Sequence, residues 1–401
     1  MASATQPGDT GSIAETPGTT RLHDLHTRGG QSPWMDNMRR DYLRNGHLEE
    51  LIAAGVRGAT SNPTIFQKAI EGENDYDDQL AEQLSGHDPK EAVWQLIYSD
   101  IEDALRHFAP VYESSEARDG FVSIEVDPAL AYDSDGTLEA ARTIWKRFRA
   151  PNLLVKIPAT EPCLQAIEDA TAEGIKVNVT LIFGLARYEA VIRSFKAGYE
   201  RLTANDPATA SSAFSVASFF VSRVDTEVDR RLDELAAEFE YNGVATHIVQ
   251  DVRDLRGRAA VAQASLAYGI FLDQFCRGVR PDPGAPLPPG TQIPLWASTS
   301  AKNPAYPDTI YVDNLVFPMT INTMPDATLD AFSDHGSPSV SPIDPESSRG
   351  TLEHLDELGV DMDDVTAVLE KQGVEAFARS FDDLVSAVQR KMSGSAKAVT
   401  R

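Results

Sequence analysis

Short apolar segments alternate with longer amphipathic segments through most of this chain. Eight runs of apolar or small residues have the length and composition of buried strands: 32–36, 56–60, 120–126, 152–157, 175–183, 213–221, 293–299 and 320–324. The clearest helical stretches between them are 36–54, 92–108, 137–149, 186–202 and 258–278. Strands that alternate with helices predict βαβ units and a parallel sheet.

Eight such units in 401 residues predict a TIM (β/α)8 barrel as a single α/β domain over residues 31–395. An open doubly wound sheet is the alternative, but no G-x-G-x-x-G fingerprint follows a strand. Residues 1–30 are rich in Gly, Thr, Ser and Ala, and we expect a disordered tail there. The Pro/Gly-rich stretch 282–293 predicts a long loop before the seventh strand.

One strand contains a lysine inside its apolar run: Lys156, in NLLVKIPAT at 152–160. A buried ammonium costs several kcal/mol unless it is paired, neutralised or exposed in a cavity. Burial favours the neutral amine, which is a nucleophile toward carbonyl groups. From this run alone, a lysine at the strand end with its head in solvent is an equally good interpretation.

The other predicted strands also deliver polar side chains, in or just after the strand, and barrel active sites lie at the C-terminal ends of strands. One buried polar residue is often a satisfied core hydrogen bond. Six or more on successive strands are better explained by a shared polar cavity, because buried polar groups without partners are costly. The candidates are Asp36, Asn62, Glu125, Lys156, Asn178, Thr180, Ser218, Arg223, Ser298 and Lys302.

These residue types fit a Schiff-base enzyme. Lys156 would attack a ketose carbonyl, and Asp36 would take a hydroxyl proton during retro-aldol cleavage. Glu125 and Thr180 would position a water for the carbinolamine steps.

The remaining candidates would bind the substrate. Asn62 and Asn178 can hold substrate hydroxyls. Arg223 can grip a phosphate, helped by a serine hydroxyl or a lysine. Structural alternatives stay open for three of the candidates: ion pairs of Arg223 with Asp225 or Asp229, an ion pair of Glu125 with Arg142, and a helix N-cap role for Asp36.

The composition narrows the function class. The formal net charge is −25, which argues against nucleic-acid binding but allows one or two local cations to hold a small phosphorylated substrate. No apolar run approaches the 18 residues of a membrane span, and the N-terminus lacks the apolar segment of a secretory signal, so we expect a cytoplasmic protein. Two cysteines, Cys163 and Cys276, predict neither a disulfide framework nor a metal site.

The chain closely resembles transaldolase of the longer bacterial type. The resemblance runs from about Ser32 to the region of His335, in SPWMDNMRRDYL, VRGATSNPTIFQKAI, VSIEVDPALAYD, PNLLVKIPAT, VNVTLIFGLARYEAV, SVASFFVSRVDTEVD, PLWASTSAKNPAYPDT and TINTMPDATL. It implies a TIM barrel of the pentose phosphate pathway that transfers a dihydroxyacetone unit from sedoheptulose 7-phosphate to glyceraldehyde 3-phosphate, with no metal or organic cofactor. We expect a monomer or a homodimer with sugar phosphates as its partners.

By motif, the resemblance implies these roles: Schiff base for Lys156, acid/base for Asp36, water positioning for Glu125 and Thr180, substrate hydroxyls for Asn62, Asn178 and Ser218, and phosphate for Arg223. Shorter family members carry a serine and then an arginine for phosphate after the seventh strand. The corresponding sequence in this chain is ASTSAKNP, so Ser298 matches the serine and Lys302 is the candidate replacement for the arginine.

Two other functions compete with this one. The first is an aldolase activity on fructose 6-phosphate that releases free dihydroxyacetone. The Phe219–Phe220 pair after Ser218 favours transfer, because aldolases of that type tend to place a tyrosine near the catalytic water. The second is a non-catalytic sugar-phosphate-binding barrel, which would not need a buried amine at Lys156.

Overall fold

Eight parallel strands close into one barrel in sequence order, so the predicted TIM (β/α)8 barrel is confirmed. The structure, a computed structural model, describes residues 19–72, 75–82 and 86–399, and side chains as far as residue 393. The strands are β1 Gln31–Met35, β2 Ala59–Thr60, β3 Val122–Glu125, β4 Leu153–Pro158, β5 Val177–Ile182, β6 Ser215–Phe220, β7 Gln292–Ala297 and β8 Thr320–Met324.

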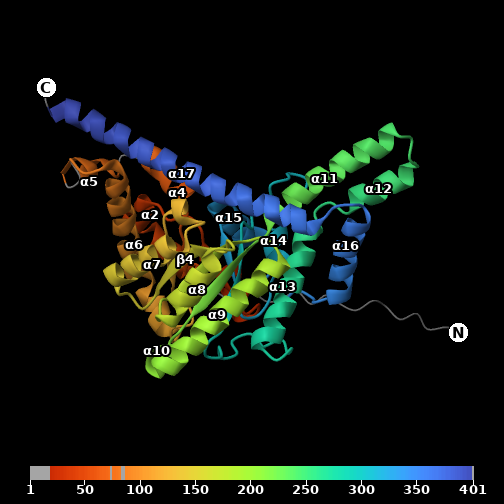
Figure 1. Cartoon of the computed structure of the whole chain (residues 1–401), viewed down its shortest axis with the longest axis horizontal. Helices are drawn as coiled ribbons and strands as arrows, with labels where there is room; N and C mark the ends of the chain where they lie inside the picture. The colour runs from red at the N-terminus through yellow and green to blue at the C-terminus, as the bar shows by residue number, and fades with distance from the viewer. Residues whose placement is uncertain (1–18, 73–74, 83–85, 400–401) are drawn as a thin grey trace.

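Helices surround the barrel (Figure 1). They are α1 Arg21–Thr27, α2 Arg40–Arg44, α3 His47–Ala53, α4 Pro63–Gly72, α5 Asp77–Glu82, α6 Pro89–Ser114, η1 Pro128–Leu130, α7 Ser134–Phe148, α8 Cys163–Ala172, α9 Leu185–Asn205, α10 Pro207–Ala210, α11 Ser222–Tyr241, α12 Thr246–Asp254, α13 Ala259–Phe275, α14 Ile310–Asp313, α15 Asp326–His335, α16 Pro345–Glu357 and α17 Met362–Val399. None of the helices described here is both long and apolar enough for a bilayer span.

Each of the eight predicted strand runs overlaps an observed strand, because strands of a barrel are covered on both faces and therefore read as continuous apolar runs. The predicted helix over 36–54 is instead two short helices, α2 and α3. Gly46 separates them with φ 91°, a left-handed conformation that glycine adopts without steric cost. Residues 277–291 form the expected long loop before β7.

The N-terminal boundary needs a correction. Helix α1 begins after the N-cap Thr20 and buries Leu22 and Leu25, so the predicted disordered tail does not extend to residue 30. The remainder of that prediction, residues 1–18, lies outside the described residues.

The long C-terminal helix α17 passes beside the ends of several barrel elements (Figure 1). It packs on α4 and α6, and its Val374, Phe377 and Phe381 are buried. The hydroxyl groups of Thr64 in α4 and Ser380 in α17 are 2.8 Å apart. This helix therefore closes one side of the barrel mouth. The apolar runs that predicted the strands did not indicate that a helix would lie there.

A buried ion pair ties α2 to α6 and gives the first prediction. Arg40 Nε lies 2.7 Å from Asp100 Oδ1, and neither side chain is exposed. In Arg40→Ala the Asp100 carboxylate would stay buried without its cation, so we expect a loss of about 3–5 kcal/mol in the free energy of unfolding, measured by chemical denaturation. Arg44→Ala, an exposed position on the same helix, should cost less than about 0.5 kcal/mol. Equal losses in the two variants would contradict this assignment.

Candidate active site

A cavity of about 310 Å³ lies at the C-terminal ends of the strands, with α4 and α17 beside it. It contains eight of the ten predicted site residues, which come from strands or strand ends all around the barrel: Asp36, Asn62, Lys156, Thr180, Ser218, Arg223, Ser298 and Lys302. Closure of the barrel brings together side chains that are far apart in the sequence, and this is the end at which barrel enzymes hold their active sites.

Lys156 points into this cavity from β4. Its side chain is almost fully buried, so the alternative of a strand-end lysine with its head in bulk solvent is wrong. The Nζ atom lies 3.1 Å from Glu125 Oε1 and donates a hydrogen bond to the backbone oxygen of Ser61 at 2.9 Å. Glu125 and Lys156 are register partners on β3 and β4, which is why the two side chains meet.

Glu125 is the carboxylate next to the amine. Burial raises its pKa, and the charge of Lys156 opposes that shift. Beyond the ion pair, neither oxygen of Glu125 has a hydrogen-bond partner among the described residues. The alternative pairing with Arg142 is wrong, because Arg142 pairs with Glu139 and Glu173 on the outer surface.

Thr180 follows a similar pattern on β5. Its hydroxyl is buried and has no partner within the described residues, although it lines the cavity. The register of β5 against β6 shifts between Val179 and Ile182, and Leu181 has φ 61° in this irregular segment. Bulges of this kind redirect side chains beside active sites. The buried hydroxyl can therefore bond a water or a substrate oxygen.

Asn178 does not line the cavity, unlike the direct substrate contact expected from the sequence. It is fully buried, and its Nδ2 donates to Ser123 Oγ at 2.9 Å. Its Oδ1 accepts from Ser218 Oγ at 2.7 Å, and Ser218 does line the cavity. Asn178 thus lies behind the cavity wall and orients Ser218 through this hydrogen bond.

Asp36 lies just after β1, facing the same cavity. Its pKa is raised to about 6, first by burial and then by the carboxylate of Asp326, while the charges of Lys156 and Lys302 oppose the shift. Helix α2 begins at Arg40 with Arg39 as its N-cap, so the helix-cap alternative for Asp36 is wrong. An acid with a pKa near 6 can exchange protons at neutral pH.

Arg223 stands near the start of α11, with its guanidinium 5.4 Å from the centre of the Phe220 ring. Burial lowers its pKa. The predicted alternative partners are occupied elsewhere: Asp225 accepts from the Ala260 amide and Tyr311, and Asp229 accepts from the Gly257 amide and Tyr306. No carboxylate of the described residues forms an ion pair with Arg223, so its charge is available to an anion in the cavity.

Lys302 and Lys68 add two more cations to the cavity wall. Lys302 Nζ donates to Ser300 Oγ at 2.5 Å, and its pKa is lowered by burial and by the charges of Arg223 and Lys68. Ser298 follows β7 with φ 56°, and its hydroxyl lies 2.9 Å from that of Ser222. A residue held in this rare conformation is typical of functional sites.

Lys68 and Phe377 also line the cavity, although neither was predicted from the sequence as a site residue. Lys68 lies on α4, the helix that begins just after Asn62, and the i,i+4 spacing of Thr64 and Lys68 could have placed both on one helix face. Phe377 comes from α17, whose position over the barrel depends on tertiary packing, so no local signal pointed to it.

Comparison with known proteins identifies the family. A family model described as "Transaldolase/Fructose-6-phosphate aldolase" matches residues 33–388. Similar curated proteins named "Transaldolase" come from Parafrankia sp. (strain EAN1pec), 44% identical over 94% of this chain and 99% of the relative, and from Arthrobacter sp. (strain FB24), 42% identical over 96% and 100%. Another, from Thermobifida fusca (strain YX), is 45% identical over 91% of this chain and 96% of its own. The chain therefore belongs to the transaldolase/fructose-6-phosphate aldolase family.

Proposed function

We propose that this protein is a transaldolase that transfers a dihydroxyacetone unit from sedoheptulose 7-phosphate to glyceraldehyde 3-phosphate through a Schiff base on Lys156. The observation that carries the proposal is the buried Lys156–Glu125 pair, whose lysine lines a cavity shared with Asp36 and three further cations, while Glu125 lies behind the cavity wall. Family membership supports transfer of an aldehyde or ketone residue. A cytoplasmic location, and a monomer or homodimer, are proposed from the sequence alone.

The first half-reaction begins at Lys156. Its amine gives up a proton to Glu125, which is 3.1 Å away, and attacks the C2 carbonyl of the donor. Glu125 then returns a proton, through a water held with the Thr180 hydroxyl, to the oxygen of the carbinolamine. Water leaves, and the product is an iminium ion between Lys156 and C2.

Cleavage follows at the C3–C4 bond. Asp36 takes the proton of the C4 hydroxyl, an aldose phosphate forms and leaves, and the bonding electrons move into the iminium to give an enamine. In the second half-reaction the enamine attacks the aldehyde carbon of the acceptor, and Asp36 returns its proton to the new hydroxyl. Hydrolysis of the iminium releases the product ketose and regenerates the amine.

The cation cluster of Arg223, Lys302 and Lys68 would hold the phosphate end of donor and acceptor. Guanidinium and ammonium groups bind phosphate by charge-assisted hydrogen bonds, and a partly buried cluster is weakly screened by salt. Arg223 contributes the planar donor group, while the two lysines act as point charges.

Fructose-6-phosphate aldolase activity is the second candidate, since the family description includes it. The aromatic residues of the cavity wall are Phe220 and Phe377, and no tyrosine belongs to this wall within the described part of the chain. This composition favours transfer, on the expectation that aldolases of that type place a tyrosine near the catalytic water.

A coupled assay separates the candidates. With fructose 6-phosphate and erythrose 4-phosphate together, we expect sedoheptulose 7-phosphate and glyceraldehyde 3-phosphate to accumulate. With fructose 6-phosphate alone, we expect no continuous release of glyceraldehyde 3-phosphate. Continuous release without acceptor would identify an aldolase, and binding without product in either mixture would identify a non-catalytic barrel.

The role of Glu125 gives the second prediction. Glu125→Gln keeps the size of the side chain but cannot accept the proton of Lys156, so turnover should fall by about 10²-fold or more. Steady-state kinetics would measure the loss, with Glu139→Gln as an exposed control that keeps full activity. Wild-type turnover in Glu125→Gln would leave Glu125 with a purely structural role.

The third prediction concerns Arg223. Arg223→Ala should weaken the use of phosphorylated donors by about 1.5–3 kcal/mol in kcat/KM, the value of a charge-assisted hydrogen bond. Non-phosphorylated donors such as dihydroxyacetone should be almost unaffected. Equal losses for both kinds of donor would show that Arg223 maintains the structure of the site and does not bind phosphate.

A further inference from the structure

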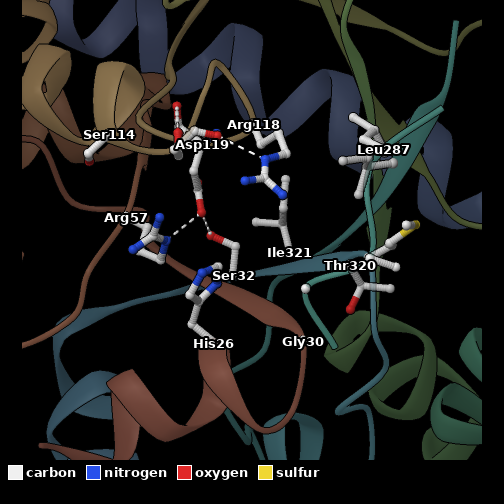
Figure 2. Close-up of a pocket in the computed structure, with 15 residues that line it drawn as sticks. His26, Gly30, Ser32, Arg57, Ser114, Arg118, Asp119, Leu287, Thr320 and Ile321 are labelled. Atoms are coloured by element: carbon white, nitrogen blue, oxygen red, sulfur yellow. Dashed lines mark hydrogen bonds and ion pairs between the residues drawn. The ribbon is translucent and has the colours of Figure 1, made fainter. Parts of the chain in front are cut away.

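A second cavity of about 310 Å³ lies at the opposite end of the barrel, where the strands begin (Figure 2). Ser32, Thr320 and Ile293 line it from the first or second residue of β1, β8 and β7, and Arg57 precedes β2. The loop that carries Arg118 and leads to β3 lies on another side. This end of a TIM barrel serves stability in most enzymes of the fold, and the mechanism above uses none of these residues.

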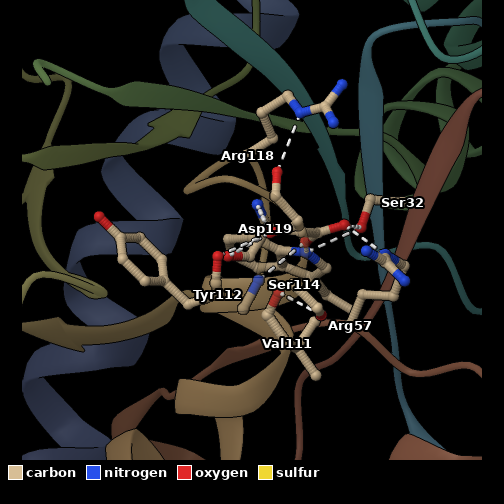
Figure 3. Close-up of polar contacts among 10 residues, drawn as sticks. Ser32, Arg57, Val111, Tyr112, Ser114, Arg118 and Asp119 are labelled. Atoms are coloured by element: carbon tan, nitrogen blue, oxygen red, sulfur yellow. Dashed lines mark hydrogen bonds and ion pairs between the residues drawn. The ribbon is translucent and has the colours of Figure 1, made fainter. Parts of the chain in front are cut away.

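Arg57 is anchored here through one nitrogen only (Figure 3). Asp119, a buried carboxylate, accepts from Arg57 Nε at 2.6 Å, from Ser32 Oγ at 2.6 Å and from Trp34 Nε1 at 2.9 Å. The two terminal nitrogens of Arg57 have no hydrogen-bond partner among the residues described. Because the guanidinium is already held at Nε, little further side-chain freedom would be lost if these two donors bound a ligand.

Arg118 is held in the same way. Its Nε donates to the backbone oxygen of Ser115 at 2.9 Å. Its Nη2 lies 3.7 Å from Oε2 of Glu116, a carboxylate that is mostly exposed to solvent. Figure 2 shows the guanidinium groups of Arg118 and Arg57 on either side of the Asp119 side chain, with His26 nearby. Burial and the charges of Arg57 and Arg118 lower the pKa of His26, so both cations act on the same region.

Apart from Ser114, Ser115 and Asp119, the remaining wall is mainly apolar and suits a ligand larger than a bare ion. Leu287, Ile293, Met319 and Ile321 supply it. Leu287 belongs to the Pro/Gly-rich loop before β7. This loop packs closely on Gly30: a Cβ atom added at Gly30 would lie 3.0 Å from the Cα of Pro283. The cavity volume falls at the lower end of the range for small-molecule sites and far exceeds the roughly 30 Å³ that one water occupies in the liquid.

We propose that this cavity is a second binding site, for a small metabolite that carries an oxyanion, either a phosphate monoester or a carboxylate. The terminal nitrogens of Arg57 and Arg118 would bind the oxyanion, and the apolar wall would contact the rest of the molecule. The formal net charge of the chain is −25, so a general attraction to anions cannot account for binding, and the two arginines must supply it locally.

The test is calorimetric titration of the full-length protein carrying Arg223→Ala, which we expect to weaken phosphate binding in the proposed active site. The probes are glycerol 3-phosphate for a phosphate monoester, citrate for a carboxylate and glycerol as the neutral control. We expect one saturable site for at least one anionic probe and none for glycerol. Saturation by glycerol 3-phosphate alone would identify phosphate as the ligand group, and saturation by citrate alone would identify carboxylate. No saturable binding of either anion would overturn the proposal.

Adding Arg118→Gln to that background should weaken binding about tenfold or more, since it removes a charge-assisted contact. Arg193→Gln removes an exposed arginine elsewhere and should leave the affinity unchanged. Bound probe should also slow hydrogen exchange in residues 111–121 and 282–293. Unchanged affinity in Arg118→Gln, or protection confined to the active-site strand ends, would place the anion elsewhere and overturn the proposal.

Discussion

Lys156→Ala should have no measurable turnover, because every step of the proposed transfer passes through a covalent bond to its Nζ atom. In the wild-type protein, borohydride reduction in the presence of fructose 6-phosphate should trap one adduct. Peptide mass spectrometry should find it on Lys156, and the alanine variant should show none. This lysine is the one that faces the cavity beside Glu125.

Lys176 is the informative control. Burial lowers its pKa to about 8, so a neutral amine is readily available there at alkaline pH. However, it precedes β5 at the other end of the barrel, where its Nζ donates to the backbone oxygen of Pro151 at 2.6 Å and approaches the Tyr112 ring. Lys176→Arg should keep full activity. An adduct on Lys176, or an active Lys156→Ala variant, would refute the proposed mechanism.

Asp36→Ala should form the Schiff base but cleave it about 10²–10⁴-fold more slowly, the usual contribution of a general acid–base group. Lys156 makes the covalent bond without help from Asp36, whereas C3–C4 cleavage needs a base at the C4 hydroxyl. A donor adduct should therefore accumulate, and it should be visible by mass spectrometry without borohydride trapping. Donor cleavage at the wild-type rate would mean that another carboxylate takes the proton.

The same residue should set the acid side of the pH profile. Asp36 acts as a base only when ionised, and its pKa is raised to about 6, so donor cleavage should decline as pH falls through about 6. The nearby charge of Asp326 contributes to that raised pKa, so Asp326→Asn should move the decline to lower pH. A decline that stays in place in both Asp36→Ala and Asp326→Asn would belong to a different group.

The barrel could be predicted from sequence because its strands are local features. Each strand is buried on both faces and reads as a short apolar run between turn signals, whatever its neighbours are. A charged or amide side chain inside such a run, as at Lys156 or Asn178, is conspicuous for the same reason. The order of eight runs with helices between them then leaves few possible topologies.

The helices around the site were less predictable. The break between α2 and α3 depends on a left-handed Gly46, which a helical periodicity of apolar residues does not reveal. The position of α17 depends on contacts with α4 and α6, which lie more than 240 residues earlier in the chain. No local pattern in the sequence therefore indicated that Phe377 would line the cavity.

The sequence by itself determined the fold class and the strand on which, or after which, each candidate side chain lies, since both follow from local patterns of burial. Tertiary structure decided the partners. The register of β3 against β4 places Glu125 next to Lys156, whereas Arg142 pairs with carboxylates on the surface. Which cation pairs with Glu125 therefore depends on strand neighbours that are distant in the chain. Asp225 and Asp229 accept hydrogen bonds from residues on other elements, so neither pairs with Arg223, whose charge remains available in the cavity. Hydrogen bonds and ion pairs act over a few ångströms, so only the folded chain could settle which of these groups would meet.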